Sequence, residues 1–188
     1  MGLSIATTAP SSMHGAVVPI GYGVSSGSSN GITFTNIPQI YQDLMVVVNY
    51  RSTASVSQDG LYLYANNVTN GNYSSTLLYG DGSSASSTRT TGDYYGATVG
   101  VMPGASATSG IFGSATSHIL NYTNTTNYKT AITRVACDLN GSGRTYLATS
   151  LLRGTAAITS LSLFVYGNSG NIVSGSTAEL FGVRTVNQ

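Results

Sequence analysis

Ser25 lies in a segment that fits the pattern of a catalytic motif. Gly23-Val-Ser-Ser-Gly27 matches Gly-x-Ser-x-Gly, in which a strand before the serine and a helix after it expose a strained nucleophilic hydroxyl. Residues 28–31 (Ser-Ser-Asn-Gly) continue as turn residues, so the pattern lacks its helix. We interpret Ser25 as a loop serine and expect no hydrolase chemistry from it.

The segment at residues 138–143 resembles the start of a calcium-binding loop. Its oxygen-bearing side chains precede a glycine, but the twelfth position of such a loop is Thr149 in place of the bidentate glutamate. Asn140-Gly141 between two strand-like runs is typical of a tight hairpin turn. We therefore predict a turn here and no calcium site.

The chain offers few ligands for transition metals and one thiol. His14 and His118 are its two histidines, they lie far apart in the sequence, and Cys137 is the single cysteine. His118 and Cys137 both fall in strand-like runs, where a buried structural role is more common than chemistry. We predict no metal, no cofactor and no catalytic residue, and hence a non-enzymatic protein.

The chain is poor in charge. Only 7% of the 188 residues are charged and the formal net charge is +1, too little to gather phosphates or anionic lipids. The apolar run at residues 44–48 is far shorter than the ~20 residues of a membrane-spanning helix. Residues 1–10 lack the pattern of a secretory signal. We expect neither nucleic acid nor a membrane as a partner.

The elements that must position any functional residue are strands. Apolar and polar residues alternate in residues 60–65, which places Tyr62 and Tyr64 on one face, and again in residues 160–166. Since turn residues separate such runs and no segment has the periodicity of a crossover helix, we predict an all-β antiparallel β-sandwich of jelly-roll type. Ten runs are predicted as strands: 16–24, 32–35, 44–50, 60–65, 76–79, 111–122, 129–138, 144–152, 160–166 and 178–184.

Three segments depart from this pattern. Residues 36–43 combine a capping asparagine with a proline near the first turn, which predicts one short helical turn. Residues 1–29 are rich in small and polar residues, so we expect an extended N-terminal arm outside a single sandwich domain at 30–188. Residues 81–110 are rich in Gly, Ser and Thr, and they predict a long loop that either binds a partner or is a flexible insertion.

Tyrosine is the most informative compositional bias, with 13 Tyr against 4 Phe and no Trp. Tyr combines apolar area with a hydroxyl and is enriched at interfaces. The same bias arises if tyrosines such as Tyr62 and Tyr64 only cap the core, and the sequence leaves both interpretations open. Within the long loop, Tyr94 and Tyr95 are the candidate contact residues.

The N-terminal arm contains its own candidate contacts. Small polar residues bury little on their own, yet isolated apolar residues among them suit strand addition to the exposed sheet edge of a neighbouring subunit. We therefore expect the arm to contact a neighbour and the chain to form a homo-oligomer, for which a trimer would fit a local threefold axis. The candidate residues are Val17, Val18, Ile20 and Tyr22.

Five blocks follow one another along the chain: ITFTNIPQIYQDL at 32–44, NNVTNGNYS at 66–74, NYTNTTNYKT at 121–130, TAAITSL at 155–161 and SGSTAELFG at 174–182. Through these blocks, residues 32–184 resemble a family of structural proteins of the tailed-bacteriophage virion. The family pattern often has an aromatic residue near Leu152 and a tyrosine where Phe181 stands, and this chain departs from it at both positions.

The resemblance implies a β-rich structural subunit that is made in the host cytoplasm and incorporated into the virion, with no catalytic set to transfer. We expect a capsid decoration or cement protein that binds the major capsid protein. A neck, tail or fibre position, bound to other virion proteins, stays open. From another class, a glycan-binding module for the host surface, with Tyr94 and Tyr95 at its site, is the alternative.

Overall fold

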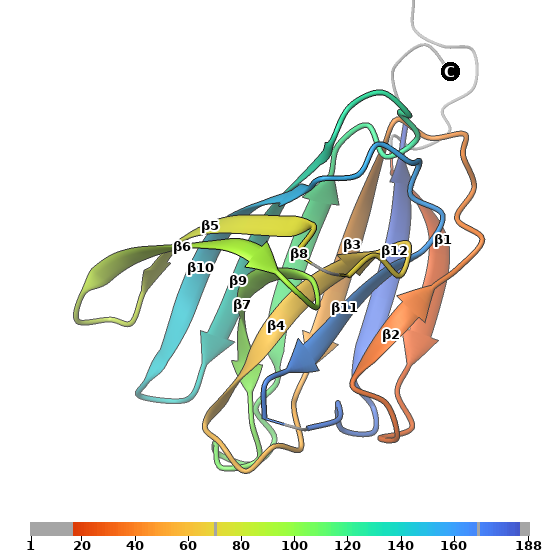
Figure 1. Ribbon diagram of the computed structural model, residues 1–188. Helices are drawn as coiled ribbons and strands as arrows, with labels where there is room; N and C mark the ends of the chain where they lie inside the picture. The colour runs from red at the N-terminus through yellow and green to blue at the C-terminus, as the bar shows by residue number, and fades with distance from the viewer. Residues whose placement is uncertain (1–16, 70, 169, 185–188) are drawn as a thin grey trace, which may run out of the picture.

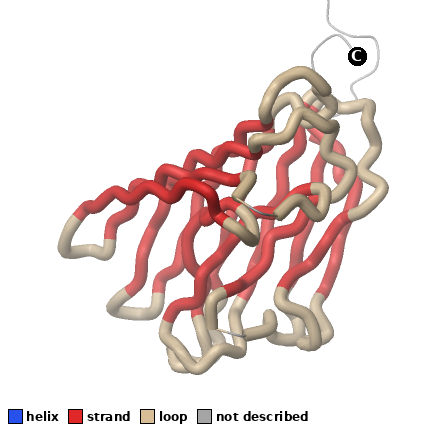
Figure 2. The backbone as a smooth tube through the Cα atoms, in the orientation of Figure 1, coloured by secondary structure: helices blue, strands red, loops and turns tan. Residues whose placement is uncertain are grey.

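The computed structural model describes residues 17–69, 71–168 and 170–184. Within them every regular element is a β-strand, and neighbouring strands are antiparallel. Figure 1 shows two sheets that lie face to face, and Figure 2 shows the turns and loops gathered at their ends. The predicted fold class, an all-β antiparallel sandwich, is confirmed.

The two sheets differ in size. In Figure 1 the smaller sheet lies in front of part of the larger one, and the β5–β6 hairpin projects beyond it. The larger sheet has the order β1 (Val17–Val24), β12 (Thr177–Val183), β3 (Asp43–Tyr50), β8 (Gly113–Ile119), β9 (Lys129–Asp138), β10 (Gly143–Leu152), β5 (Tyr73–Gly80) and β6 (Ala85–Asp93). The smaller sheet has the order β2 (Gly31–Phe34), β11 (Leu161–Tyr166), β4 (Gln58–Ala65) and β7 (Ala97–Pro103).

The strand order contains two sets of four that match each other. β1-β12-β3-β8 in the larger sheet faces β2-β11-β4-β7 in the smaller one, so the chain crosses repeatedly between the sheets, as in a jelly roll built of two Greek keys. Two hairpins, β5–β6 and β9–β10, are inserted into this order and extend the larger sheet. The jelly roll stays an interpretation, which this strand order supports.

Alternating side chains of the facing strands build the core. In β9 the buried residues Ala131, Thr133, Val135 and Cys137 alternate with exposed or half-buried ones, as expected for a strand with one face inward. The smaller sheet contributes its own inward residues to the same core. These include Leu61 and Leu63 of β4 and their register partners on β11, Val165 and Leu163. The other side of each strand therefore points away from the core.

Buried tyrosines link the two layers. The Tyr50 hydroxyl of β3 donates to the backbone oxygen of Leu163 and accepts from the backbone nitrogen of Ile32, both at 3.1 Å. The Tyr73 hydroxyl bonds in the same way to the backbone nitrogen and oxygen of Ala65, at 3.0 and 3.2 Å. Burial raises the pKa of Tyr50, and it raises the pKa of Tyr73 to about 12. Some of the many tyrosines, such as Tyr50 and Tyr73, therefore belong to the core.

The predicted helical turn at residues 36–43 is wrong. This stretch contains no helix and connects β2 to β3 through bends, with Asn36 in the left-handed region at φ 54°. Ile37 and Tyr41 are both buried in the core. Packing of these two side chains decides the path of the chain, because local capping signals contribute only about 1 kcal/mol.

The prediction of an arm at residues 1–29 is wrong where the structure describes it, because β1 pairs along its length with β12 of the same chain. The first sixteen residues lie outside the described residues. Val18 and Ile20 pack against the core of their own chain. Small residues help here, since a side chain at Gly21 would begin only 2.7 Å from the ring of Phe34 on β2. Glycine lets the two strands approach closely.

The long loop predicted at residues 81–110 is also largely wrong, because it contains β6 and β7. β6 is an edge strand that pairs with β5 alone, and it has no large apolar side chain to reveal it. β7 lies at the edge of the other sheet and buries Val99 and Met102. What remains as loop is the turn at residues 81–84, the turn between β6 and β7, and the segment after β7.

A buried cation, Arg51, contacts the segment after β7. Its Nη1 donates to the backbone oxygens of Thr108 and Ile111, at 2.7 and 2.9 Å. Its Nη2 donates to those of Ala105 and Ala107, at 3.3 and 2.8 Å. Since a guanidinium presents five donors in a planar fork, one side chain fixes four carbonyls of this loop.

Candidate binding surfaces

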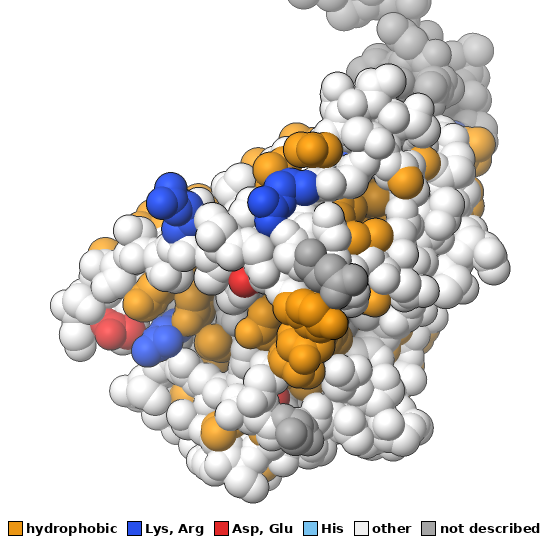
Figure 3. Space-filling model, in the orientation of Figure 1, with side chains coloured by type: hydrophobic (Ala, Val, Ile, Leu, Met, Phe, Trp, Pro, Cys, Tyr) orange, Lys and Arg blue, Asp and Glu red, His pale blue; other side chains and the backbone are white. Residues whose placement is uncertain are grey.

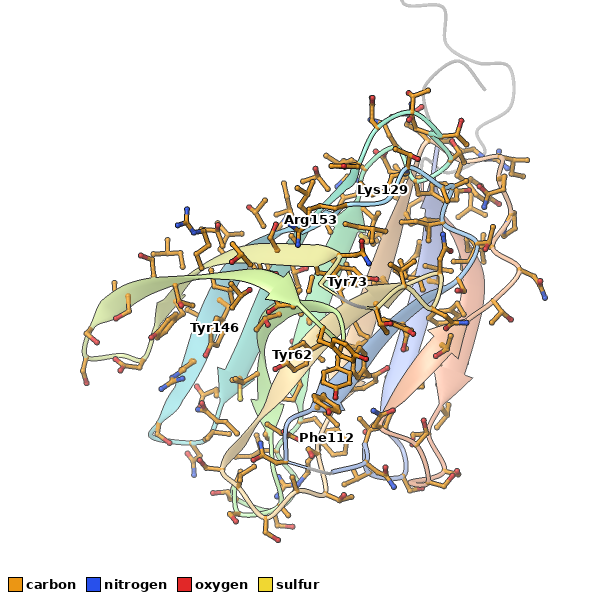
Figure 4. The ribbon with its side chains drawn as sticks, viewed as in Figure 1. Tyr62, Tyr73, Phe112, Lys129, Tyr146 and Arg153 are labelled. Atoms are coloured by element: carbon orange, nitrogen blue, oxygen red, sulfur yellow. The ribbon has the colours of Figure 1, made fainter. Side chains whose placement is uncertain are left out.

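The outward side of the smaller sheet carries a group of aromatic rings. Tyr62 and Tyr64 of β4 and Phe164 and Tyr166 of β11 point away from the core, as the alternation predicts, and the register places Tyr62 opposite Phe164. In Figure 3 hydrophobic side chains gather in one patch on this face, and Figure 4 shows Tyr62 within it. We call Tyr62, Tyr64, Tyr94, Tyr95, Phe164 and Tyr166 the aromatic cluster.

The turn between β6 and β7 brings Tyr94 and Tyr95 onto this group. The ring centroids of Tyr95 and Tyr166 are 4.2 Å apart, and those of Tyr94 and Tyr95 are 4.7 Å apart. Tyr94 and Tyr95 are 54% and 43% exposed, whereas Phe164 beneath the other rings is 9% exposed. The cluster thus has a buried floor and an exposed rim of tyrosines.

Asp93 shapes the turn that holds Tyr94 and Tyr95. Its Oδ2 accepts from the Thr90 hydroxyl at 2.7 Å and from the backbone nitrogen and hydroxyl of Thr98 at 3.2 and 3.1 Å. Gly96 then passes close to the smaller sheet, since a side chain there would begin 2.6 Å from the backbone oxygen of Leu63. This turn is held by defined contacts at both ends.

A shallow hollow of about 250 Å³ lies beside the cluster. Aromatic rings form one part of its wall, and neutral hydroxyl and amide side chains form the rest. Burial, followed by the negative charge of Asp93, raises the pKa of the adjacent Tyr62 hydroxyl. The residues that line the hollow are uncharged, and Asp93 is a negative charge near it. Its lining residues are Asn30, Thr33, Tyr64, Thr69, Tyr95, Ser162, Phe164 and Tyr166.

A second surface is the outward side of the larger sheet, which we call the open face. Directly paired residues of an antiparallel sheet point to the same side, so the register gives two rows across all eight strands. One row is Pro19, Phe181, Met45, His118, Ile132, Thr149, Thr76 and Arg89, and the next is Tyr22, Glu179, Val47, Thr116, Arg134, Leu147, Leu78 and Ser87.

The open face is apolar for a surface. Six of the eleven exposed large hydrophobic residues in the described part of the chain lie on it: Val17, Tyr22, Val24, Leu78, Ile132 and Leu147. Its charged side chains are few, and on it His118 Nε2 lies 3.3 Å from Asp43 Oδ2, without hydrogen-bond geometry. An apolar face of this extent is typical of a surface that docks on another protein.

The candidate contact residues of the sequence divide between these surfaces. Tyr94 and Tyr95 belong to the aromatic cluster, whereas Val17 and Tyr22 lie on the open face. Val18 and Ile20 of the same strand point inward. The structure therefore does not bring the six predicted residues into one site.

The residues that fitted catalytic or metal motifs have structural partners. The Ser25 hydroxyl donates to Ile172 O at 3.3 Å and accepts from Gly27 N at 3.0 Å, and bends follow it in place of a helix. Asp138 Oδ1 accepts from Asn140 N at 2.8 Å within the β9–β10 turn. Burial raises the pKa of the Cys137 thiol to about 11, so the thiol is not an activated nucleophile.

A larger hollow, of about 460 Å³, lies between the β5–β6 and β9–β10 turns. Asp81 and Asp138 both line it, but their carboxylates already stabilise their own turns, Asp81 by accepting from the backbone nitrogens of Ser83 and Ser84 at 2.9 and 2.8 Å. Across residues 17–69, 71–168 and 170–184, no three His, Cys, Asp or Glu side chains form a group that would hold a metal ion.

Comparison with protein-family models, curated proteins and solved structures finds no match to this chain. The resemblance to phage virion proteins therefore stays a prediction. In the part of the chain that the structure describes, no helix is long and apolar enough to cross a membrane.

Sequence reasoning placed the β11 residues of the aromatic cluster on one face, but it missed the apolar residues of the open face. The alternation in residues 160–166 assigns Phe164 and Tyr166 to the side opposite the inward leucines of β11. Leu78, Ile132 and Leu147 likewise occupy outward positions of amphipathic strands. An apolar residue at a position that should be polar is the signal that would have found them.

Proposed function

We propose that this protein is a non-enzymatic structural subunit of a tailed-phage particle, a capsid decoration or cement protein that docks on the capsid through the open face. The resemblance of residues 32–184 to virion proteins supports the assignment to a particle. The open face is the single structural observation that supports docking, because six exposed hydrophobic side chains lie on it.

The size of the open face suits a stable protein contact. Eight strands spaced at about 4.8 Å span about 34 Å, and seven residues along a strand cover about 24 Å. The resulting area of about 800 Å² equals the area that each partner buries in a standard protein interface. A broad sheet surface with few charges matches a protein lattice better than it matches nucleic acid or an anionic membrane.

Quantitative mass spectrometry of purified particles tests this function. We expect the chain to be present in a copy number close to that of the major capsid protein. A few copies per particle would instead assign it to the neck, tail or a fibre. Absence of the chain from particles that contain the other structural proteins would refute any virion role.

We also propose self-association, now through the free edge of β1. This strand ends the larger sheet, and its second edge has no partner strand among the described residues. Such an edge accepts an added strand from another chain through backbone hydrogen bonds. Light scattering of the full chain and of a variant without residues 1–16 should give a mass above 19.3 kDa in both cases. A monomeric full chain at high concentration would refute self-association.

A further inference from the structure

We propose that the hollow beside the aromatic cluster binds a neutral saccharide, with one sugar ring against Tyr95, Phe164 and Tyr166 and its hydroxyls facing the polar wall. The open face lies on the opposite side of the sandwich and belongs to the other sheet. The two proposals are independent of each other, and one subunit can dock on a particle while it presents this hollow outward.

The aromatic wall matches the apolar face of a sugar ring. Tyr95 and Tyr166 are tilted by 38° to each other, with Phe164 beneath them, its centroid 6.4 Å from that of Tyr166. The C–H groups of a pyranose face pack against such rings, which contribute large apolar area and stay fixed because two torsions suffice to order each ring. The position of Tyr95 is fixed by the turn that Asp93 closes.

The polar wall matches the hydroxyls of a sugar. Asn30, Thr33 and Thr69 offer both donors and acceptors. The Ser162 hydroxyl donates to Ile32 O at 3.0 Å, so its lone pairs are left to accept from a ligand. A mixture of donors and acceptors without charge distinguishes a saccharide from an apolar peptide segment, which would leave these groups unpaired.

Charge selects a neutral ligand. None of the eight residues that line the hollow carries a formal charge. The carboxylates that act on the adjacent Tyr62 are those of Asp93 and Asp59, and both disfavour an anion. Phosphorylated, sulfated or sialylated ligands would meet this negative potential without a cation to pair with.

The dimensions limit what can be enclosed. A hollow of about 250 Å³ is slightly smaller than the range of about 300–1,000 Å³ found for sites of drug-sized ligands. It has room for one ring, and further rings of a chain would extend over Tyr94 and Tyr95 toward solvent. Contact along the exposed rim would then favour oligosaccharides over monosaccharides.

Saturation-transfer NMR on the full chain tests the proposal. The probes are glucose, galactose, mannose and N-acetylglucosamine, their neutral tetrasaccharides, and a sialylated trisaccharide as the anionic comparison. We expect transfer to the ring protons of at least one neutral sugar and none to the sialylated one. Tyr95→Ala and Tyr166→Ala should each weaken binding about two- to tenfold, the range for loss of one aromatic contact.

Tyr128→Ala is the matched control, because Tyr128 is an exposed tyrosine outside the cluster, and it should leave transfer unchanged. Both cluster tyrosines are exposed, and far-UV circular dichroism verifies that each variant is folded. The proposal would be overturned if none of the neutral probes showed transfer. It would also be overturned if the two cluster variants bound as strongly as the control. If Tyr95→Ala abolishes attachment to particles without any sugar binding in the parent, the cluster is a protein-docking surface and the saccharide site is refuted.

Discussion

Replacement of Tyr50 by phenylalanine removes one oxygen atom from the centre of the sandwich. The Tyr50 hydroxyl stands between β2 and β11, where Ile32 and Leu163 are register partners, and it bonds the backbone nitrogen of one and the backbone oxygen of the other. Tyr50 is fully buried. The Tyr50→Phe variant keeps the ring and its packing, so the expected effect comes from the two backbone groups that lose their partner.

The magnitude follows from the cost of unpaired buried groups. An unsatisfied buried donor or acceptor costs about 1–3 kcal/mol. Two such groups are left in the variant, and β2 and β11 can move closer together, which lowers the total cost. We expect the free energy of unfolding to fall by about 2–4 kcal/mol. For a domain of this length that corresponds to a fall in Tm of about 5–10 °C.

Urea unfolding followed by far-UV circular dichroism measures this effect. Tyr146→Phe is the matched control, because Tyr146 is also buried but its hydroxyl accepts only from Arg144 Nη1, at 3.3 Å. The control should lose less than about 1 kcal/mol. An equal loss in the two variants would refute the role of the Tyr50 hydroxyl as a link between the layers.

Three further predictions concern single residues. The pKa of Tyr73 is raised to about 12 in the folded protein, so the unfolded chain loses this proton at a lower pH. The free energy of unfolding should therefore fall as pH rises from about 10 to 12, and unfolding curves in this range should show a weaker fall for Tyr73→Phe. Arg51→Met should speed hydrogen exchange of the amides at residues 105–111 at least tenfold, since four carbonyl contacts of that loop are lost, while exchange in β9 stays unchanged. Asp93→Ala should broaden the NMR signals of the Tyr94–Tyr95 turn, because the turn loses the carboxylate that holds it. The free energy of unfolding should change by less than about 1 kcal/mol, because the turn is at the surface. Sharp, unshifted signals would contradict the positioning role of Asp93.

Strands with regular alternation were predictable, and irregular edges were not. The strand predicted at residues 129–138 coincides with β9, whose side chains alternate strictly between core and surface. β6 has small polar residues on both sides, because an edge strand at the end of a projecting hairpin faces little core. A pattern that depends on burial cannot reveal a strand that buries almost nothing.

The candidate surfaces were predictable only in part, for a related reason. Alternation placed Tyr62 and Tyr64 outward, and composition singled out Tyr94 and Tyr95. Their meeting depends on the chain crossing from the larger to the smaller sheet between β6 and β7, which is a tertiary property. The role of β1 was misjudged because glycines, which bury little themselves, allow Phe34 to pack against the strand.

Attachment to particles that lack this chain tests the central claim most directly. Purified protein is mixed with such particles, and the bound fraction is measured by cosedimentation for the parent and for two variants. Leu147→Glu puts a charge on the open face, whereas Ile40→Glu puts the same charge at an even more exposed hydrophobic position outside the strands of that face. Both side chains point to solvent in the free protein, so both variants should fold.

Burial of an unpaired carboxylate in an apolar contact costs at least about 1.4 kcal/mol, which corresponds to a tenfold loss of affinity. We predict that Leu147→Glu weakens attachment at least tenfold and that Ile40→Glu attaches like the parent. Attachment of Leu147→Glu at the parent's affinity would contradict docking through the open face, and failure of the parent to attach would contradict the proposed function itself.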